Sequence, residues 1–166
     1  MKKVLILGST GSIGQSTIDI IENNPDKFTA SALIANTNAL LLAKQAKAVS
    51  ASAVGIFDES KRAELEELLA NTGTRVVAGR DAILELAREP YDITLSAIVG
   101  IAGLEPTMAA IPNTKVLALA NKESLVCAGD IINDALKQHG TTIMPVDSEH
   151  NAIFQVFESA NLEQIS

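Results

Sequence analysis

Short runs of apolar residues recur along the chain at intervals that suit a regular sheet. The first run, Val4–Leu7, contains no polar residue, and such a continuous run is typical of a strand buried on both faces. Similar runs predict strands at 1–7, 28–35, 53–57, 76–78, 93–98, 115–120 and 141–146. Pro145 falls in the last run and cannot donate a ladder hydrogen bond, so we expect it on an edge strand or at the end of its strand.

Segments with helical spacing separate the apolar runs. The first begins near Ile13 and ends before Pro25, with an apolar side predicted to comprise Ile13, Thr17, Ile20 and Ile21. Further helices are expected at 39–49, 58–69, 80–88 and 104–111. A helix with its main run at about 128–139 follows the strand at 115–120, and another begins within 151–157. Strands that alternate with helices indicate βαβ units. We therefore expect an α/β fold, a Rossmann-like doubly wound, mainly parallel sheet flanked by helices.

The amino-acid composition indicates what kind of core the chain has and which classes of partner it can bind. Hydrophobic residues make up 47% of the 166-residue chain but aromatic residues only 3%, so the core is aliphatic. The net charge of −7 argues against nucleic acid, because non-specific binding to a phosphate backbone needs positive charge. No apolar run is long enough to span a membrane and no leader is evident, so we expect no membrane partner.

Cys127 is the single cysteine, which excludes an internal disulfide and favours a reducing, cytoplasmic location. It lies in the apolar stretch Leu125–Ala128. A cysteine in such a stretch is expected to be a buried, inert small hydrophobe rather than a nucleophile.

The segment Gly8-Ser9-Thr10-Gly11-Ser12-Ile13-Gly14 follows the first predicted strand and precedes the first helix. Glycines at such a turn let backbone N–H groups approach a phosphate, and the helix directs the positive end of its dipole at the same charge. This order of elements predicts a pyrophosphate-binding turn, with an ordinary glycine-rich connection as the alternative.

The end of the second predicted strand reads Ala35-Asn36-Thr37-Asn38. This position commonly selects between NAD and NADP: an acid binds the ribose hydroxyl of NAD, and a basic residue suits the 2′-phosphate of NADP. The segment carries neither, so NADP is permitted but must be held by neutral donors. A polar turn in the left-handed conformation, without a ligand role, is the alternative.

Two further groups of polar residues follow predicted strands. Asn121-Lys122-Glu123 could fix a small anionic substrate, or Asn121 could cap a helix. In the extended segment after Val146, Asp147 and Glu149 would point to one side and could bind Mg²⁺ or Mn²⁺. The alternative there is a helix cap, and on spacing alone the cap is favoured.

Three stretches, ILGSTGSIGQSTIDII, ALANKESLVCAG and PVDSEHNAIFQ, together resemble the 1-deoxy-D-xylulose 5-phosphate reductoisomerase family over the whole chain. The resemblance implies NADPH-dependent isomerisation and reduction of 1-deoxy-D-xylulose 5-phosphate to 2-C-methyl-D-erythritol 4-phosphate, in the non-mevalonate isoprenoid pathway. It also implies a divalent cation (Mg²⁺, Mn²⁺ or Co²⁺) and a homodimer.

The resemblance also assigns roles to residues. It places NADPH against Thr10, Gly11, Ser12, Ile13, Asn36, Thr37, Asn38, Asn121 and Glu123. It places the phosphorylated sugar substrate against Lys122 and Ser148. It makes Asp147 and Glu149 metal ligands, in place of the cap that spacing alone favours.

Two features depart from the family pattern. The turn at 36–38 lacks the lysine that members often carry there, which weakens the argument for NADP over NAD. The chain is also less than half as long as family members, so it resembles their amino-terminal part. We expect an NADPH-binding domain at 1–150, the start of a truncated central domain at 151–166, and no turnover by the chain alone.

Two alternatives to the reductoisomerase stay open from the sequence. The first is an NADP oxidoreductase of the semialdehyde-dehydrogenase type, which would use a cysteine nucleophile. The second is a non-catalytic nucleotide sensor, which would not need Asp147, Glu149 or Lys122.

Overall fold

The computed structural model describes residues 1–146, with Lys122 described only in its backbone. Seven strands form one sheet: β1 Lys2–Leu7, β2 Phe28–Ala35, β3 Ala53–Ile56, β4 Arg75–Ala78, β5 Tyr91–Ser96, β6 Thr114–Leu119 and β7 Thr142–Pro145. Their order in the sheet is β4-β3-β2-β1-β5-β6-β7, and every neighbouring pair is parallel. The predicted Rossmann-like α/β fold is confirmed, and Pro145 lies on an edge strand as expected.

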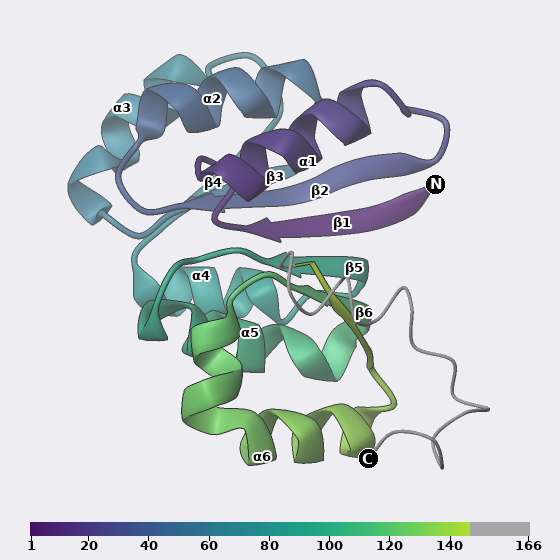
Figure 1. The fold of residues 1–166 in the computed structure, drawn as a ribbon. Coiled ribbons are helices and arrows are strands. Elements are labelled where there is room, and N and C mark those ends of the chain that lie inside the picture. Colours follow the sequence, from purple (N-terminus) through teal and green to yellow (C-terminus); the bar gives the residue numbers. More distant parts are fainter. Residues whose placement is uncertain (147–166) are drawn as a thin grey trace, which may run out of the picture.

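In the described part of the chain, six α-helices cover the two faces of the sheet: α1 Ser12–Glu22, α2 Ala39–Ala48, α3 Arg62–Leu68, α4 Arg80–Ala87, α5 Leu104–Ala110 and α6 Lys122–His139. Short 3₁₀ turns lie at η1 Glu59–Lys61, η2 Ile101–Gly103 and η3 Ile111–Asn113. Helices α1–α3 lie on one side of the sheet and α4–α6 on the other (Figure 1). Within residues 1–146, none of the helices has the length and apolar character to cross a membrane.

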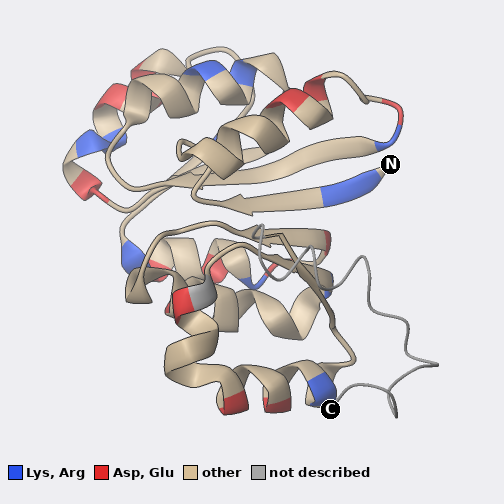
Figure 2. Cartoon of the chain, in the orientation of Figure 1, with Lys and Arg blue, Asp and Glu red and all other residues tan. Residues whose placement is uncertain are grey.

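The central strand β1 is buried on both faces, which accounts for its unbroken apolar sequence. Val4 and Ile6 pack in the core beneath α1–α3, whereas Leu5 and Leu7 pack on the opposite side with α4 and α5. A third apolar cluster joins β6 to α6. Charged residues lie mainly on the helices and at the amino ends of the strands (Figure 2).

The order in which strands are added to the sheet reverses at β1. Strands β2, β3 and β4 extend from one side of β1, and after α4 the chain returns to place β5 on its other side. In open α/β sheets, ligands bind at the carboxyl ends of the strands where the strand order reverses. A ligand site is therefore expected at the carboxyl ends of β1 and β5.

Two helices differ from the sequence prediction. In α1 the buried residues are Gly14, Ile18 and Ile21, whereas Ile20 is 55% exposed. Helix α6 begins at Lys122 rather than 128 and has non-helical backbone angles at Ala128, where Figure 1 shows a sharp bend. The apolar pattern of the second half of α6 predicted only the part beyond this bend.

Candidate nucleotide-binding site

The turn between β1 and α1 depends on two glycines that allow close backbone packing. Gly8 has φ of +90°, and a Cβ there would lie 2.8 Å from the carbonyl oxygen of Ala97. A Cβ on Gly14 would lie 2.3 Å from the Gly8 carbonyl oxygen and 2.5 Å from that of Ser9. Helix α1 therefore begins directly against the turn, and this contact sets which side of α1 is buried.

Gly11 differs, because a Cβ there would meet only the Gly8 carbonyl oxygen, at 3.4 Å. It is exposed and precedes the first residue of α1. The first N–H groups of a helix have no intrahelical acceptor, so those of Ser12 and Ile13 are available to an anion. The N–H of Thr10 likewise has no acceptor within residues 1–146.

A cavity of about 390 Å³ opens beside this turn. Its walls come from the last residue of β2 and from residues that follow β1, β2, β3 and β5: Gly8, Thr10, Gly11, Ala35, Asn36, Phe57, Ala97, Ile98, Val99 and Ala102. The structure thus brings together three of the predicted nucleotide contacts, Thr10, Gly11 and Asn36. The described lining residues are uncharged, so an anion there would be held by backbone and neutral side-chain groups.

Hydrogen bonds to α2 and to the segment after β3 fix the turn at 36–38. The Asn38 side chain caps α2 by accepting a hydrogen bond from the Leu41 N–H at 3.0 Å. The Asn36 carbonyl accepts one from the N–H of Asp58. Among the described residues other than glycine, only Ser50 and Asn71 have positive φ, so the alternative of a left-handed turn at 36–38 is wrong. Asn36 and Thr37 are exposed.

A second turn on the same edge, at 98–103, is fixed from behind by Asn121. The Asn121 side chain is 2% exposed. Its Nδ2 donates to the carbonyl oxygens of Ile98 at 2.6 Å and Gly100 at 2.8 Å, and its Oδ1 accepts from the Ser124 N–H. The cap alternative for Asn121 is therefore confirmed, and both side-chain N–H groups are used within the chain. Its contact with a nucleotide stays a prediction.

Thr107 provides a second support for this turn. Its hydroxyl donates to the Gly103 carbonyl and shares a 2.6 Å hydrogen bond with Ser96. Gly103 is also required, because a Cβ there would lie 2.4 Å from Asn121 Nδ2. The wall formed by Ile98, Val99 and Ala102 is thus held in place from α5 and α6.

The first turn of α6 carries Lys122 and Glu123 at the carboxyl end of β6. Glu123 is exposed. Cys127 is also exposed, so its predicted burial is wrong. An apolar stretch of this kind is typical of a core segment, but this one belongs to the first part of α6, where Val126 is 84% exposed.

Asp147, Ser148 and Glu149 lie outside the described residues, as does the predicted domain boundary at 150. The chain reaches Val146 at the carboxyl end of β7, where its N–H donates to the Leu119 carbonyl. This is the same edge of the sheet as the glycine-rich turn, because all the strands are parallel. Within residues 1–146, no cluster of three or more His, Cys, Asp or Glu is arranged to hold a metal ion.

Sequence reasoning missed the apolar walls of the cavity, formed by Phe57, Ala97, Ile98, Val99 and Ala102. Part of the signal was available, because the glycines at 100 and 103 follow a predicted strand in the same way as those at 8–14. Their position next to β1, however, depends on the strand order, which the local pattern does not contain.

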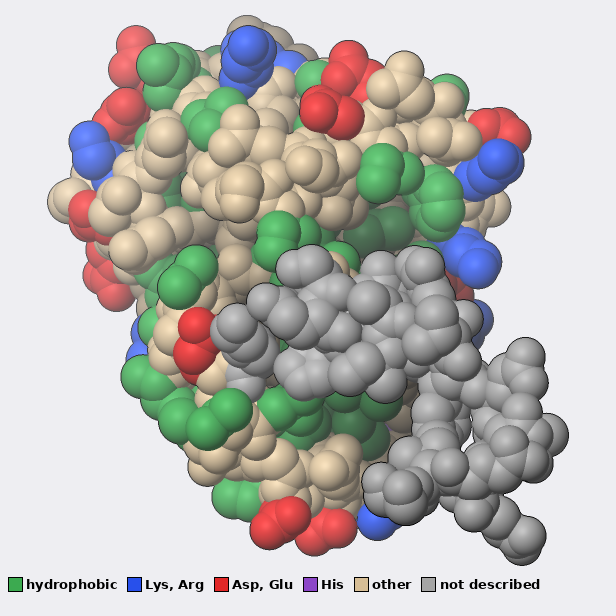
Figure 3. Space-filling model, viewed as in Figure 1, with side chains coloured by type: hydrophobic (Ala, Val, Ile, Leu, Met, Phe, Trp, Pro, Cys, Tyr) green, Lys and Arg blue, Asp and Glu red, His purple; other side chains and the backbone are tan. Residues whose placement is uncertain are grey.

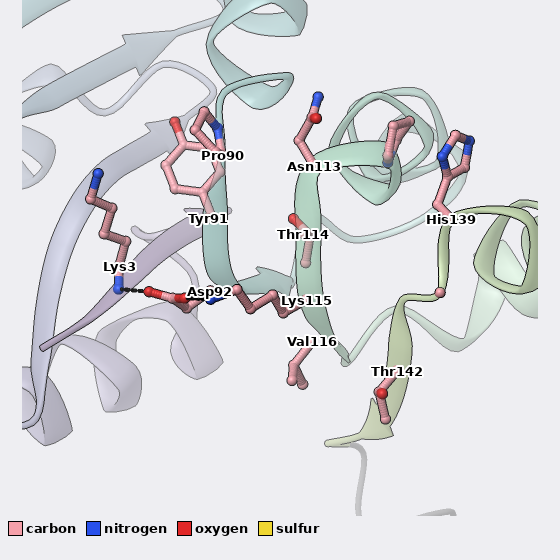
Figure 4. A pocket seen from close by; sticks show the side chains of 12 residues that line it. Lys3, Pro90, Tyr91, Asp92, Asn113, Thr114, Lys115, Val116, His139 and Thr142 are labelled. Carbon is pink, nitrogen blue, oxygen red and sulfur yellow. Dashed lines mark hydrogen bonds and ion pairs between the residues drawn. The ribbon is translucent and has the colours of Figure 1, made fainter.

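A larger cavity of about 680 Å³ lies at the opposite edge, around the amino ends of β5 and β6. In it the Asp92 carboxylate accepts a hydrogen bond from the Lys3 backbone N–H at 2.8 Å and pairs with Lys115 Nζ at 2.6 Å (Figure 4). The hydrogen bond from Lys115 lowers the pKa of Asp92, with a further contribution from Lys3. These contacts join three strands at the edge away from the glycine-rich turn.

Comparison with known proteins agrees with this geometry. A family model described as 1-deoxy-D-xylulose 5-phosphate reductoisomerase matches residues 4–129. The chain is 48% identical over 164 residues to 1-deoxy-D-xylulose 5-phosphate reductoisomerase of Gluconobacter oxydans, covering 99% of this chain and 40% of that protein. It is 49% identical over 164 residues to the protein of the same name from Zymomonas mobilis, covering 99% of this chain and 42% of the relative.

Solved structures give the same result. The Zymomonas mobilis reductoisomerase in complex with NADPH superposes with a TM-score of 0.92 at 51% identity, over 96% of this chain and 42% of that chain. A reductoisomerase in complex with NADPH, fosmidomycin and magnesium superposes with a TM-score of 0.89 at 38% identity, over 97% of this chain and 40% of the other. The chain therefore spans about two fifths of the length of its relatives, and it belongs to the 1-deoxy-D-xylulose 5-phosphate reductoisomerase family.

Proposed function

We propose that this chain is the NADPH-binding part of an enzyme that converts 1-deoxy-D-xylulose 5-phosphate to 2-C-methyl-D-erythritol 4-phosphate. The observation that carries the proposal is the cavity between the glycine-rich turn and the 98–103 turn, at the point where the strand order reverses. Family membership adds that relatives of this sequence have been solved with NADPH and magnesium.

In this proposal, the backbone N–H groups of Thr10, Ser12 and Ile13 hold the pyrophosphate. The available N–H groups and the positive end of the α1 dipole favour an anion there. Asn36, Thr37 and Asn38 lie at the adenosine ribose and its 2′-phosphate. Because Asn38 already caps α2, we assign the 2′-phosphate mainly to the exposed side chains of Asn36 and Thr37.

Asn121 supports the nucleotide site by fixing the 98–103 turn, whereas Glu123 lies on the exposed side of the same helix end. We assign Lys122 and Ser148 to the substrate and Asp147 and Glu149 to the divalent cation. A cation bound by carboxylates supplies Lewis-acid polarisation of substrate oxygens. Two carboxylates form an incomplete Mg²⁺ or Mn²⁺ site, so further ligands must come from water, substrate or residues beyond this chain. The homodimer implied by the resemblance and the cytoplasmic location expected from the single cysteine belong to the same proposal.

Calorimetric titration of the chain with NADPH and NADH, with and without Mn²⁺, tests the nucleotide assignment. We expect saturable NADPH binding that is tighter than NADH binding. We also expect no oxidation of NADPH when 1-deoxy-D-xylulose 5-phosphate and Mn²⁺ are added to the chain alone. Absence of NADPH binding would overturn the nucleotide assignment, and substrate-dependent oxidation would show that this part is catalytically complete.

A further inference from the structure

One polar side chain of helix α2, that of Gln45, contacts the backbone of the glycine-rich turn. Gln45 is 5% exposed, and its Nε2 donates a hydrogen bond to the carbonyl oxygen of Ser9 at 2.8 Å. Ser9 is fully buried, and the two residues lie 36 positions apart in the chain. The contact therefore connects the turn to an element outside the β1–α1 unit.

The apolar surroundings make this glutamine unusual for its position. Leu42, Ala43 and Ala46 are buried on the same helix and belong to the core beneath α1–α3. A buried amide without partners is costly, and Gln45 Oε1 has no partner within residues 1–146. An apolar side chain would suit the core as well or better, so the packing of α2 does not account for the amide.

The orientation of the peptide group between Ser9 and Thr10 accounts for the buried amide of Gln45. In a trans peptide the carbonyl and the N–H of the next residue point to opposite sides, and no cis peptide occurs within residues 1–146. Holding the Ser9 carbonyl against α2 therefore turns the Thr10 N–H away from α2. Thr10 lines the cavity, and its N–H is one of the groups without an acceptor within residues 1–146.

A second glutamine acts on the adjoining peptide group. Gln15 Nε2 donates to the Thr10 carbonyl at 3.0 Å, but Gln15 is exposed, so water can replace it. The Gln45 bond is shielded from water, and a buried donor is harder to replace.

We propose that Gln45 is a positioning residue for the nucleotide site: it fixes the Ser9 peptide group so that the Thr10 N–H faces the pyrophosphate of NADPH. This rests on the proposed nucleotide-binding function. Without the amide donor, the Ser9 carbonyl is buried with no partner, and the peptide group rotates to regain one. The pyrophosphate then loses a donor and faces a carbonyl oxygen.

The test compares Gln45→Met, which keeps the length of the side chain and removes both N–H donors, with the unchanged chain. We expect NADPH to bind about tenfold more weakly to Gln45→Met, the effect of losing one hydrogen bond to a charged group. Adenosine 2′-monophosphate has no pyrophosphate, so its affinity should not change. Lys47→Met, at an exposed position on the same helix, should bind both ligands as the unchanged chain does.

Equal NADPH affinity in the unchanged chain and Gln45→Met would overturn the inference, and so would equal weakening for both ligands, which indicates general distortion of α2. A chain that binds no NADPH before mutation would instead overturn the proposed function. If Gln45→Met does not fold, the amide resonance of Thr10 in the unchanged chain decides. It should shift and exchange more slowly with NADPH, and an unaffected resonance during binding would contradict the inference.

Discussion

The glycines of the β1–α1 turn have separable roles at the scale of single residues. Gly14 allows α1 to contact the turn, whereas Gly11 lies at the edge of the cavity, where a Cβ would meet only the Gly8 carbonyl oxygen. Gly8, Gly11 and Gly14 look equivalent in the sequence. Only the space around each α-carbon shows which glycine is needed for folding and which is available for ligand binding.

We expect Gly14→Ala to destabilise the chain by about 3 kcal/mol or more, because its Cβ would overlap two carbonyl oxygens. Gly11→Ala should stay within about 1 kcal/mol of the unchanged chain but bind NADPH at least about tenfold more weakly. Urea unfolding gives the first quantity and calorimetric titration the second. Equal stability of the two variants would contradict the assigned roles.

Asn121→Asp keeps the acceptor for the Ser124 N–H but replaces two N–H donors with a carboxylate that faces the Ile98 and Gly100 carbonyls. We expect a loss of about 3 kcal/mol in unfolding free energy, because a charged acceptor would be buried against acceptors. The control is Asn113→Asp, whose amide donates to the Arg88 carbonyl at an exposed site. That variant should lose no more than about 1 kcal/mol, and a similar loss in both would argue against the special role of Asn121.

At the scale of elements, the amino ends of β1, β5 and β6 are joined through Asp92. Its carboxylate contacts the Lys3 backbone and the Lys115 side chain. Because these contacts lower the pKa of Asp92 from its ordinary value of 3.8, they contribute stability above pH 4. That contribution is lost as the pH falls through the lowered pKa.

Asp92→Asn should therefore lower the melting temperature at pH 6 to 7 and have a progressively smaller effect as the pH falls below about 4. Thermal unfolding followed by circular dichroism between pH 2.5 and 7 measures this convergence. Asp26→Asn, at an exposed acid before β2, controls for the loss of one negative charge and should change the melting temperature at pH 6 to 7 less than Asp92→Asn does. A constant difference between Asp92→Asn and the unchanged chain at every pH would contradict the assignment.

Most elements could be predicted because local patterns determine them. The unbroken apolar run of β1 and the proline in β7 both indicated the correct place in the sheet. Of the four residues predicted on the buried side of α1, only Ile21 is buried, and Gly14 and Ile18 complete that side. The local pattern missed this because the contact of Gly14 with the turn depends on tertiary packing. The start of α6 at Lys122 could not be predicted with certainty, because an Asn121 that caps a helix and an Asn121 that binds a ligand look alike in sequence.

The candidate site was predictable only in part. The glycine pattern identified Thr10 and Gly11, and the end of β2 identified Asn36. The walls from β3 and β5 could not be predicted from local sequence, because they come from strands that are neighbours only after folding. Gln45 gave no local signal, since its partner is a backbone carbonyl 36 residues away.

At the scale of the whole molecule, the cavity lies at the carboxyl edge of the sheet and is lined by residues from both sides of β1. Exposed hydrophobic side chains also lie on the face seen in Figure 3. In the turn at 98–103, Val99 is 84% exposed and Ile101 61% exposed. Because walls from both halves of the sheet form the cavity, a ligand bound there should stabilise the domain as a unit.

NADPH at one hundred times its dissociation constant should therefore raise the unfolding free energy by about 2.7 kcal/mol, with a corresponding rise in melting temperature. Thermal unfolding with increasing NADPH measures this, and Gly11→Ala provides a folded control that should respond less at the same concentration. Two separate transitions, with only one shifted by NADPH, would show that the halves unfold independently.

The place of β1 in the middle of the sheet also bears on how the chain is assembled as it is synthesised. Strand β1 can pair with β2 soon after both are synthesised, but its partner on the other side arrives much later, as the 89-residue separation of Lys3 and Asp92 shows. Until then one edge of β1 stays open, which exposes unpaired backbone groups to other nascent chains. The carboxyl-terminal half of the sheet thus closes an edge on which the amino-terminal half could otherwise aggregate.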